Sequence, residues 1–166
     1  MNNEFNILPV TTDTQIKDIA ALAALIWNEH FTPIIGQNQV DYMLDKFQSY
    51  PALKTQIVDG YHYFQLFFKQ TFIGYTGIQI REHTLFLSKL YLLKDARGNK
   101  LSTKVIDFMQ SFCQNHNLEK IQLTCNKYNA HTLAVYKHLG FEIANTQVAD
   151  IGSGYVMDDY ILEKYI

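Results

Sequence analysis

The stretch LSKLYLLKDARGNKLSTKVIDFMQSFC, residues 87–113, joins an apolar segment to a helical repeat through a short polar turn that contains Arg97 and Gly98. The first turn of a helix offers free backbone N–H groups and the positive end of the helix dipole, which together favour an anion such as a pyrophosphate. Gly98 lets the backbone approach a ligand closely, and Arg97 and Lys100 add positive charge. The turn therefore predicts a phosphate-binding loop, although an Arg-Gly turn before a helix is also common as a simple connection.

The N-terminal part of the chain predicts a strand followed by two helices. Residues 5–10, FNILPV, have the composition of a short strand. Thr12 and Gln15 match the capping box S/T-x-x-E/Q in front of an apolar helical repeat, which marks the start of the first helix. Residues 40–47 repeat the helical spacing in a second helix, which we expect to stop before Pro51.

The remainder of the chain alternates between strand and helix patterns. Residues 61–93 contain β-branched and aromatic runs separated by short turns, which predicts three consecutive antiparallel strands. The predicted elements that follow are a helix from Leu101, a strand over 120–125, a helix over 129–139 closed by Gly140, and strands from Phe141 and Tyr155. The order β-α-α-β-β-β-α-β-α-β-β predicts an α/β fold with a mixed sheet.

Composition and charge point to one globular domain. The chain has 166 residues, of which 48% are apolar, 14% aromatic and 18% charged. No repeat or Pro/Gly-rich linker divides it, so we expect a single domain over residues 1–166. The 14 Lys and Arg residues against 16 acidic residues give a formal charge of −2, which supplies no general attraction to nucleic acid.

The N-terminus and the cysteines carry no targeting or metal signal. The start MNNEFNILPVTTD lacks the basic and apolar regions of a secretory signal, and no apolar stretch approaches membrane-spanning length. We therefore expect a cytoplasmic protein with no membrane partner. Cys113 and Cys125 lack CxxC spacing and the histidines lack ligand spacing, so we expect inert buried thiols and no metal site.

Two motifs together resemble the GNAT superfamily of acyl-CoA-dependent N-acetyltransferases. In that family a strand ending like LYV leads into R/Q-x-x-G-x-G/A and a helix, and a later Asn precedes a short helix carrying Y-x-x-x-G-F. Here residues 90–92 are LYL, Arg97 opens the loop, and residues 126–142, NKYNAHTLAVYKHLGFE, carry the second motif. Lys100 stands at the first Gly position and Ser102 at the final Gly/Ala position. The resemblance implies the GNAT fold, a mixed and mostly antiparallel sheet of about seven strands flanked by four helices.

The resemblance implies acetyl-CoA as cosubstrate and direct transfer of its acetyl group to an amine. The main chain of residues 90–92 would pair with the pantetheine arm as an added strand does, and the loop would wrap the pyrophosphate. A backbone N–H near Leu92 would polarise the thioester carbonyl. The residues assigned to the coenzyme are Leu90, Tyr91, Leu92, Arg97, Gly98, Asn99, Lys100, Leu101, Ser102, Thr103 and Asn129.

Tyr136 has the family's position for the general acid that protonates the departing thiolate. From its pattern alone, Tyr136 would serve equally well as a core ring beside Leu133. Some relatives carry a Glu as general base on the strand after the coenzyme helix, where this chain has Thr124. Glu82, Asp158 or a chain of water molecules are the alternatives that the sequence leaves open.

The acceptor in this superfamily is usually bordered by the first two helices and the C-terminal strands. The corresponding segments offer apolar walls and acidic groups, namely Trp27, Phe31 and Tyr155, with Glu29, Asp158 and Asp159. Such a mixture suits a small cationic amine, as in the polyamine acetyltransferases of the superfamily. Each of these residues has an ordinary alternative role in the core or on the surface.

Two other functions remain open from the sequence. Lys100 and Thr124 are compatible with a noncatalytic acyl-CoA-binding module, and a protein N-terminus or lysine could replace the small-molecule acceptor. The apolar C-terminal strands could leave an exposed edge, so a homodimer through them is a further hypothesis.

Overall fold

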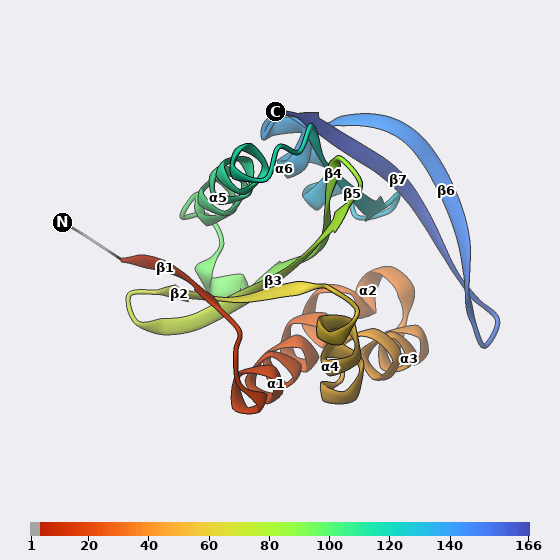
Figure 1. Cartoon of the computed structure of the whole chain (residues 1–166). Coiled ribbons are helices and arrows are strands. Elements are labelled where there is room, and N and C mark those ends of the chain that lie inside the picture. The colour runs from red at the N-terminus through yellow and green to blue at the C-terminus, as the bar shows by residue number, and fades with distance from the viewer. Residues whose placement is uncertain (1–3) are drawn as a thin grey trace. The chain divides into compact units, whose positions relative to one another are not determined.

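The computed structural model describes residues 4–166, which form seven strands, six α-helices and one short 3-10 helix (Figure 1). The elements are β1 (Phe5–Pro9), α1 (Asp13–His30), α2 (Thr32–Ile35), α3 (Gln37–Phe47), α4 (Tyr50–Val58), β2 (His62–Phe68), β3 (Thr71–Arg81), β4 (Thr84–Leu92), η1 (Lys94–Ala96), α5 (Leu101–Asn115), β5 (Lys120–Asn126), α6 (Ala130–His138), β6 (Glu142–Gly152) and β7 (Tyr155–Tyr165). Hydrogen bonds connect the strands in the order β1-β2-β3-β4-β5-β7-β6.

The sheet is mixed and mostly antiparallel, as expected. The pairs β1–β2, β2–β3, β5–β7 and β6–β7 are antiparallel, whereas β4 pairs with β5 in parallel from Thr84 to Phe86. The chain separates into two compact units. The first contains the residues up to Gln79 together with residues 89–101, and the second contains residues 80–88 and 102–166.

The first unit packs the helices α1 to α4 on one face of strands β1 to β3 (Figure 1). Ile19 of α1 and Leu53 of α4 are each 1% exposed, and Leu66 and Tyr75 of the strands are fully buried. These side chains belong to the apolar core of this unit, and burial of such side chains is the main source of folding free energy.

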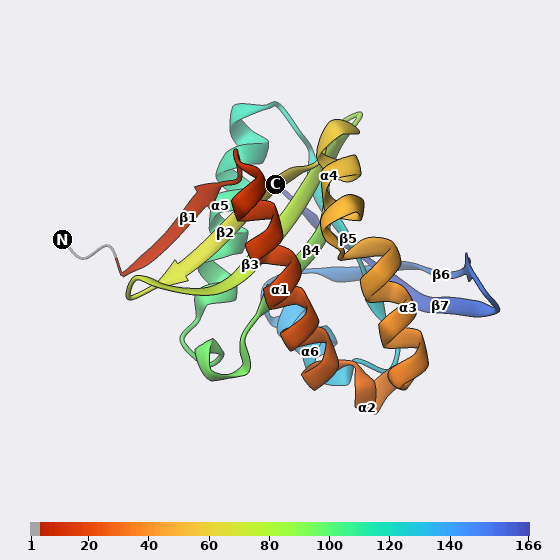
Figure 2. The same cartoon turned by 90° about the horizontal axis from the view of Figure 1, so that it is seen from below.

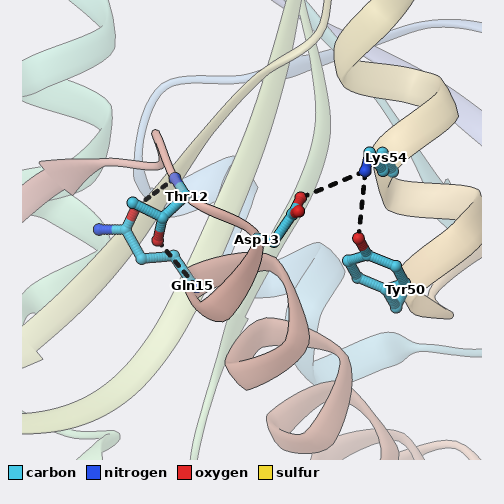
Figure 3. A network of polar contacts seen from close by, with 5 residues as sticks. All are labelled: Thr12, Asp13, Gln15, Tyr50 and Lys54. Carbon is cyan, nitrogen blue, oxygen red and sulfur yellow. Dashed lines mark hydrogen bonds and ion pairs between the residues drawn. The ribbon is translucent and has the colours of Figure 1, made fainter.

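The N-terminus of α1 confirms the predicted capping box (Figure 3). The Thr12 hydroxyl accepts a hydrogen bond from the backbone N–H of Gln15 at 3.2 Å, and the Gln15 side chain accepts one from Thr12 N at 2.9 Å. Asp13, in the first turn, forms an ion pair with Lys54 of α4 at 3.4 Å, and Lys54 also donates to the Tyr50 hydroxyl at 3.2 Å. The cap therefore sets the start of α1, and Asp13 connects it to α4.

The second unit packs α5 and α6 with strands β5, β6 and β7. Its core includes Val105, Met109, Ile121 and Leu162, each fully buried. Strands β6 and β7 form a long hairpin whose tip projects away from α5 and α6 (Figure 2). Lys164 of β7 donates to the carbonyl oxygen of Leu139 at 2.6 Å, which holds the end of α6 against the sheet.

The structure has six α-helices where the sequence predicted four. The second predicted helix does end before Pro51, as α3 stops at Phe47. However, Pro51 lies in the first turn of a further helix, α4, which Ser49 caps by accepting a hydrogen bond from Ala52 N. Proline is tolerated in the first turn of a helix because the N–H that it lacks has no partner there. The single turn α2 also begins with a proline in its first two positions. Among residues 4–166, no helix is both long enough and apolar enough to span a bilayer.

Candidate active site

The residues predicted to bind the coenzyme are divided between the two units. Residues 90–101 belong to the first unit, whereas Ser102, Thr103 and Asn129 belong to the second. In the first unit the end of β4 is held by main-chain and side-chain bonds. Leu93 N donates to the carbonyl oxygen of Ile73 at 2.8 Å, and the Arg97 guanidinium donates to the carbonyl oxygen of Leu92 at 3.1 Å. Arg97 therefore braces the end of β4 in addition to adding positive charge to the loop.

The loop before α5 has two residues in the left-handed conformation. Gly98 has a φ of 84° and Lys100 a φ of 57°. No heavy atom lies within 4 Å of the position that a Cβ would take at Gly98, so its backbone is open to a ligand. Lys100 carries a side chain in a conformation that costs about 1–2 kcal/mol for residues other than glycine. The exposed Lys100 ammonium, the open Gly98 backbone and the helix N-terminus fit a pyrophosphate.

Leu101 shows how the loop is anchored. Its side chain is 2% exposed, whereas Asn99, Lys100 and Thr103 are exposed and Ser102 is half-buried. Asn99 donates through Nδ2 to the carbonyl oxygen of Ala96 at 3.0 Å. The polar side chains therefore face solvent, while one apolar side chain fixes the start of α5.

Gly74 of β3 lies directly against the end of β4. A Cβ added at Gly74 would clash with the carbonyl oxygen of Tyr91 and would lie 2.8 Å from Cδ2 of Leu92. Because the first of these atoms is backbone, a rotamer change cannot relieve the overlap. Gly74 thus permits the close approach that places residues 90–92.

We expect Gly74→Ala to destabilise the protein by about 2–3 kcal/mol and to displace the main chain of residues 91–92, because the added methyl group overpacks the sheet. Denaturant unfolding measures the first effect and coenzyme titration the second. Gly60→Ala is the control, since no heavy atom lies within 4 Å of a Cβ at Gly60 and only its positive φ of 102° opposes the change. Equal effects of the two variants on coenzyme affinity would contradict the role given to Gly74.

Tyr91 is surrounded by aromatic rings of the same unit. Its ring lies 5.5 Å from that of Trp27, 6.0 Å from that of Phe31 and 5.5 Å from that of Tyr75. Trp27 and Phe31 also contact each other at 4.3 Å and are only 3% and 9% exposed. The two predicted acceptor residues, Trp27 of α1 and Phe31 just after its end, therefore pack in the core of the first unit and support Tyr91.

Lys89 is a charged residue in the interior that was not predicted from the sequence. Its side chain is 5% exposed and donates to the carbonyl oxygen of Phe47 at 2.7 Å, to Gln56 Oε1 at 2.7 Å and to the Tyr63 hydroxyl at 2.6 Å. Burial lowers the pKa of Lys89 to about 7. Lys89 thus joins β4 to the end of α3, to α4 and to β2. Its place in the alternating run LFLSKLYLL was the available signal.

Asn129 and Tyr136 are brought to one helix of the second unit. Asn129 precedes α6, is 6% exposed, and donates from its backbone N to the carbonyl oxygen of Asn126 at 3.0 Å. Tyr136 is 8% exposed, and its ring contacts Phe141 edge to face at a centroid distance of 5.4 Å. The ring of Tyr136 is thus fixed by packing, as a positioned proton donor requires.

The acidic residues of β7 differ sharply from each other. Asp158 forms an ion pair with Lys127 at 2.8 Å, whereas Asp159 is 3% exposed, and its Oδ1 has no hydrogen-bond partner within residues 4–166. Burial, and next the charge of Asp158, raises the pKa of Asp159 to about 6. Tyr155 is half-buried and, by strand alternation, lies on the other face of β7 from Asp158.

The remaining predicted acids and thiols have simpler surroundings. Glu29 and Glu82 are exposed, on α1 and on the turn before β4 respectively, and Thr124 is exposed on β5. Cys113 and Cys125 are buried, as expected, and burial raises the pKa of both thiols to about 11. Both are therefore weak nucleophiles at neutral pH.

A comparison with known protein families shows which family the chain belongs to. Residues 21–141 match the profile of the Acetyltransferase (GNAT) family. The chain belongs to the GNAT acetyltransferase family. The expectation of an acetyltransferase with this fold is confirmed. No curated protein matches the sequence.

Solved structures of GNAT proteins share the fold at low identity. PaiA N-acetyltransferase from Thermoplasma acidophilum, in complex with coenzyme A, is 17% identical with a TM-score of 0.82, and the match covers 100% of both chains. A spermidine N-acetyltransferase chimera of SpeG from Vibrio cholerae and hSSAT is 14% identical with a TM-score of 0.69, covering 98% of this chain and 96% of that one. The microcin C7 self-immunity acetyltransferase MccE, in complex with acetyl-CoA and AMP, is 17% identical with a TM-score of 0.70, covering 99% and 94%.

The two family motifs do not include every residue that shapes the candidate site. Gly74, Lys89 and Asp159 lie outside the two family motifs, and of these three only Asp159 was expected from the sequence, as one of several acids. Their importance depends on which strands are neighbours, which the two motifs alone do not specify.

Proposed function

We propose that the chain, acting as one domain over residues 1–166, transfers the acetyl group of acetyl-CoA to a primary amine by direct attack in a ternary complex. The observation that carries the proposal is the segment from β4 to α5. It has the family's sequence pattern, an open backbone at Gly98, and an exposed cation at Lys100 immediately before the helix. The solved neighbours that contain coenzyme A or acetyl-CoA support the choice of cosubstrate.

Within this proposal the predicted coenzyme residues keep their assigned roles. The main chain of residues 90–92 binds the pantetheine arm, residues 97–103 bind the pyrophosphate, and Asn129 binds the pantetheine. A backbone N–H near Leu92 stabilises the negative charge that develops on the thioester oxygen. The Tyr136 hydroxyl donates its proton to the departing sulfur.

We further propose a small cationic amine, such as a polyamine, as acceptor. The acids of β7 and the spermidine N-acetyltransferase chimera among the solved neighbours support this choice. Tyr155 remains a proposed contact with the acceptor. Asp158 lies on the other face of β7 and is paired with Lys127, so it is no longer proposed as a contact beside Tyr155. Trp27 and Phe31 contribute through the ring of Tyr91. The alternative acceptor, a protein N-terminus or lysine, is separated from it by comparing polyamines with peptides as substrates.

We expect acetyl-CoA and CoA, but not ATP, to raise the Tm by several degrees. A ligand that binds only the native state stabilises it by about 2.7 kcal/mol at a concentration of 100 times Kd. Thermal unfolding with each ligand measures the shift. Gly98→Val should abolish the shift, because its side chain would fill the open space over the loop. Gly60→Val imposes a similar left-handed strain away from the loop and should keep it.

Either of two results would count against the proposal. No shift at millimolar acetyl-CoA would favour a protein that has lost coenzyme binding. A normal shift without release of free thiol in the presence of any amine would favour the noncatalytic acyl-CoA-binding module.

A further inference from the structure

Asp159 carries a buried carboxyl oxygen that the fold leaves without a partner. The residue is 3% exposed, and no donor among residues 4–166 reaches Oδ1. A buried polar atom without a hydrogen bond costs free energy, and most such atoms in proteins are paired. An N–H group of a bound ligand would supply the missing donor.

The strand register places Asp159 beside the loop that leads to Tyr136. Asp159 pairs with Asn126, the last residue of β5, and with Gln147 of β6 on its other side. From Asn126 the chain turns through three residues to reach α6, which carries Tyr136. Asp159 therefore lies at the carboxyl end of β5, in the same unit as the proposed proton donor.

Burial and the charge of Asp158 raise the pKa of Asp159 by more than the charge of Lys127 lowers it. Lys127 forms its ion pair with the neighbouring Asp158, which lies on the opposite face of β7 by strand alternation. The residues paired across from Asp159, Asn126 and Gln147, are uncharged. Cys125 is a further titratable group that interacts with Asp159, and its thiol is protonated at neutral pH. The described surroundings thus include a like charge and no cation bonded to Asp159.

We propose that Asp159 is the general base of the acetyl transfer, accepting a proton from the primary amine that attacks the thioester. This role rests on the acetyltransferase function proposed above. The amine nitrogen forms a bond to the carbonyl carbon and loses one proton to Asp159, while the bond from that carbon to sulfur breaks. The departing sulfur takes a proton from the Tyr136 hydroxyl. Asp159 returns its proton to Tyr136 through solvent, which restores both residues.

The other candidate acids fit this role less well. Glu29 and Glu82 are exposed, so water solvates their carboxylates. Asp158 already has a partner, because Lys127 forms an ion pair with it at 2.8 Å. A base near neutral pH needs a carboxyl whose pKa is raised, as burial does to about 6 at Asp159.

The decisive experiment compares pH profiles of kcat/KM, measured by thiol release with a polyamine acceptor. The native enzyme should show an acid limb near pH 6, because Asp159 acts only when it is deprotonated. Asp159→Asn should lower kcat/KM by about 10²-fold at neutral pH and lose the acid limb, since general base catalysis typically contributes at least this factor. The Tm shift caused by acetyl-CoA should persist in this variant.

The matched control is Glu163→Gln. Glu163 lies four residues further along β7 on the same face, but its carboxylate has partners in Lys120 at 2.8 Å and Gln122 at 2.8 Å. This variant should keep kcat/KM within about threefold of the native value, together with the acid limb.

The outcomes separate this inference from the proposed function. An active native enzyme whose acid limb survives in Asp159→Asn would overturn the role of Asp159 and leave the acetyltransferase intact. A native enzyme that acetylates no amine would overturn both. If Asp159→Asn does not fold, the pH profile of the native enzyme still tests the proposal. A native kcat/KM without an acid limb between about pH 5 and 7 would contradict the role of Asp159 as general base.

Discussion

Replacing Tyr136 by phenylalanine is expected to lower kcat by about 10³-fold, since the leaving thiolate would lose its proton donor. The change removes one oxygen and keeps the ring, so the edge-to-face contact with Phe141 should survive. We therefore expect a Tm close to the native value and an unchanged Tm shift with acetyl-CoA. Steady-state kinetics of thiol release and thermal unfolding of the same preparation check these expectations together.

Tyr128→Phe serves as the control for this prediction. Tyr128 lies in the turn just before α6 and is 74% exposed, so removing its hydroxyl should leave kcat unaltered. A kcat for Tyr136→Phe within a few-fold of the native value would mean that Tyr136 acts only as a core ring. That result would also favour water as the group that protonates the thiolate.

Much of the fold was predictable because local chemistry and tertiary structure agree. Thr12 and Gln15 form the expected capping box, and Gly140 adopts the expected left-handed conformation with a φ of 97°. The two missed helices show where this agreement ends. Pro51 is consistent both with the end of one helix and with the first turn of another, and only the Ser49 cap distinguishes the two.

The candidate site was predictable where a motif marks it and not where neighbouring strands define it. The loop around Gly98 and the helix bearing Tyr136 carry motifs that are contiguous in sequence. Gly74 matters because β3 lies against the end of β4, and Asp159 matters because β7 pairs with the end of β5. Neither relation is contained in local propensity, since strand pairing links residues that are distant in the chain.

The burial of Lys89 likewise depends on neighbouring elements and not on local sequence. Its substitution has the largest effect on stability that we expect. A lysine at an inward-facing position of β4 could have been read as an edge or surface residue. Its three acceptors, on Phe47, Gln56 and Tyr63, come from three other elements. They compensate part of the cost of burying an ammonium group, but the pKa of about 7 indicates that a cost remains.

The sign of the pH dependence follows from proton binding. The unfolded chain holds the Lys89 proton up to a pKa of about 10.5, whereas the folded protein releases it near pH 7. Between these values the unfolded state binds more protons, so the contribution of Lys89 to the free energy of unfolding increases with pH. The full difference corresponds to up to about 5 kcal/mol.

Lys89→Met should remove this dependence without leaving an unpaired group. The carbonyl oxygen of Phe47 keeps a hydrogen bond from Gln56 Nε2 at 3.1 Å, and the Tyr63 hydroxyl still donates to Gln56 Oε1. We therefore expect the variant to be more stable than the native protein near pH 7. This advantage should shrink by several kcal/mol as the pH rises to about 10.

Denaturant unfolding of both proteins across this pH range tests the prediction through their difference. The buried thiols, whose pKa is raised to about 11, titrate in both proteins and cancel. Lys137→Met is the control, because Lys137 is exposed and water solvates its ammonium in both states. Parallel stability curves for native and Lys89→Met proteins would show that the three hydrogen bonds keep Lys89 charged in the fold, and that its burial is fully compensated.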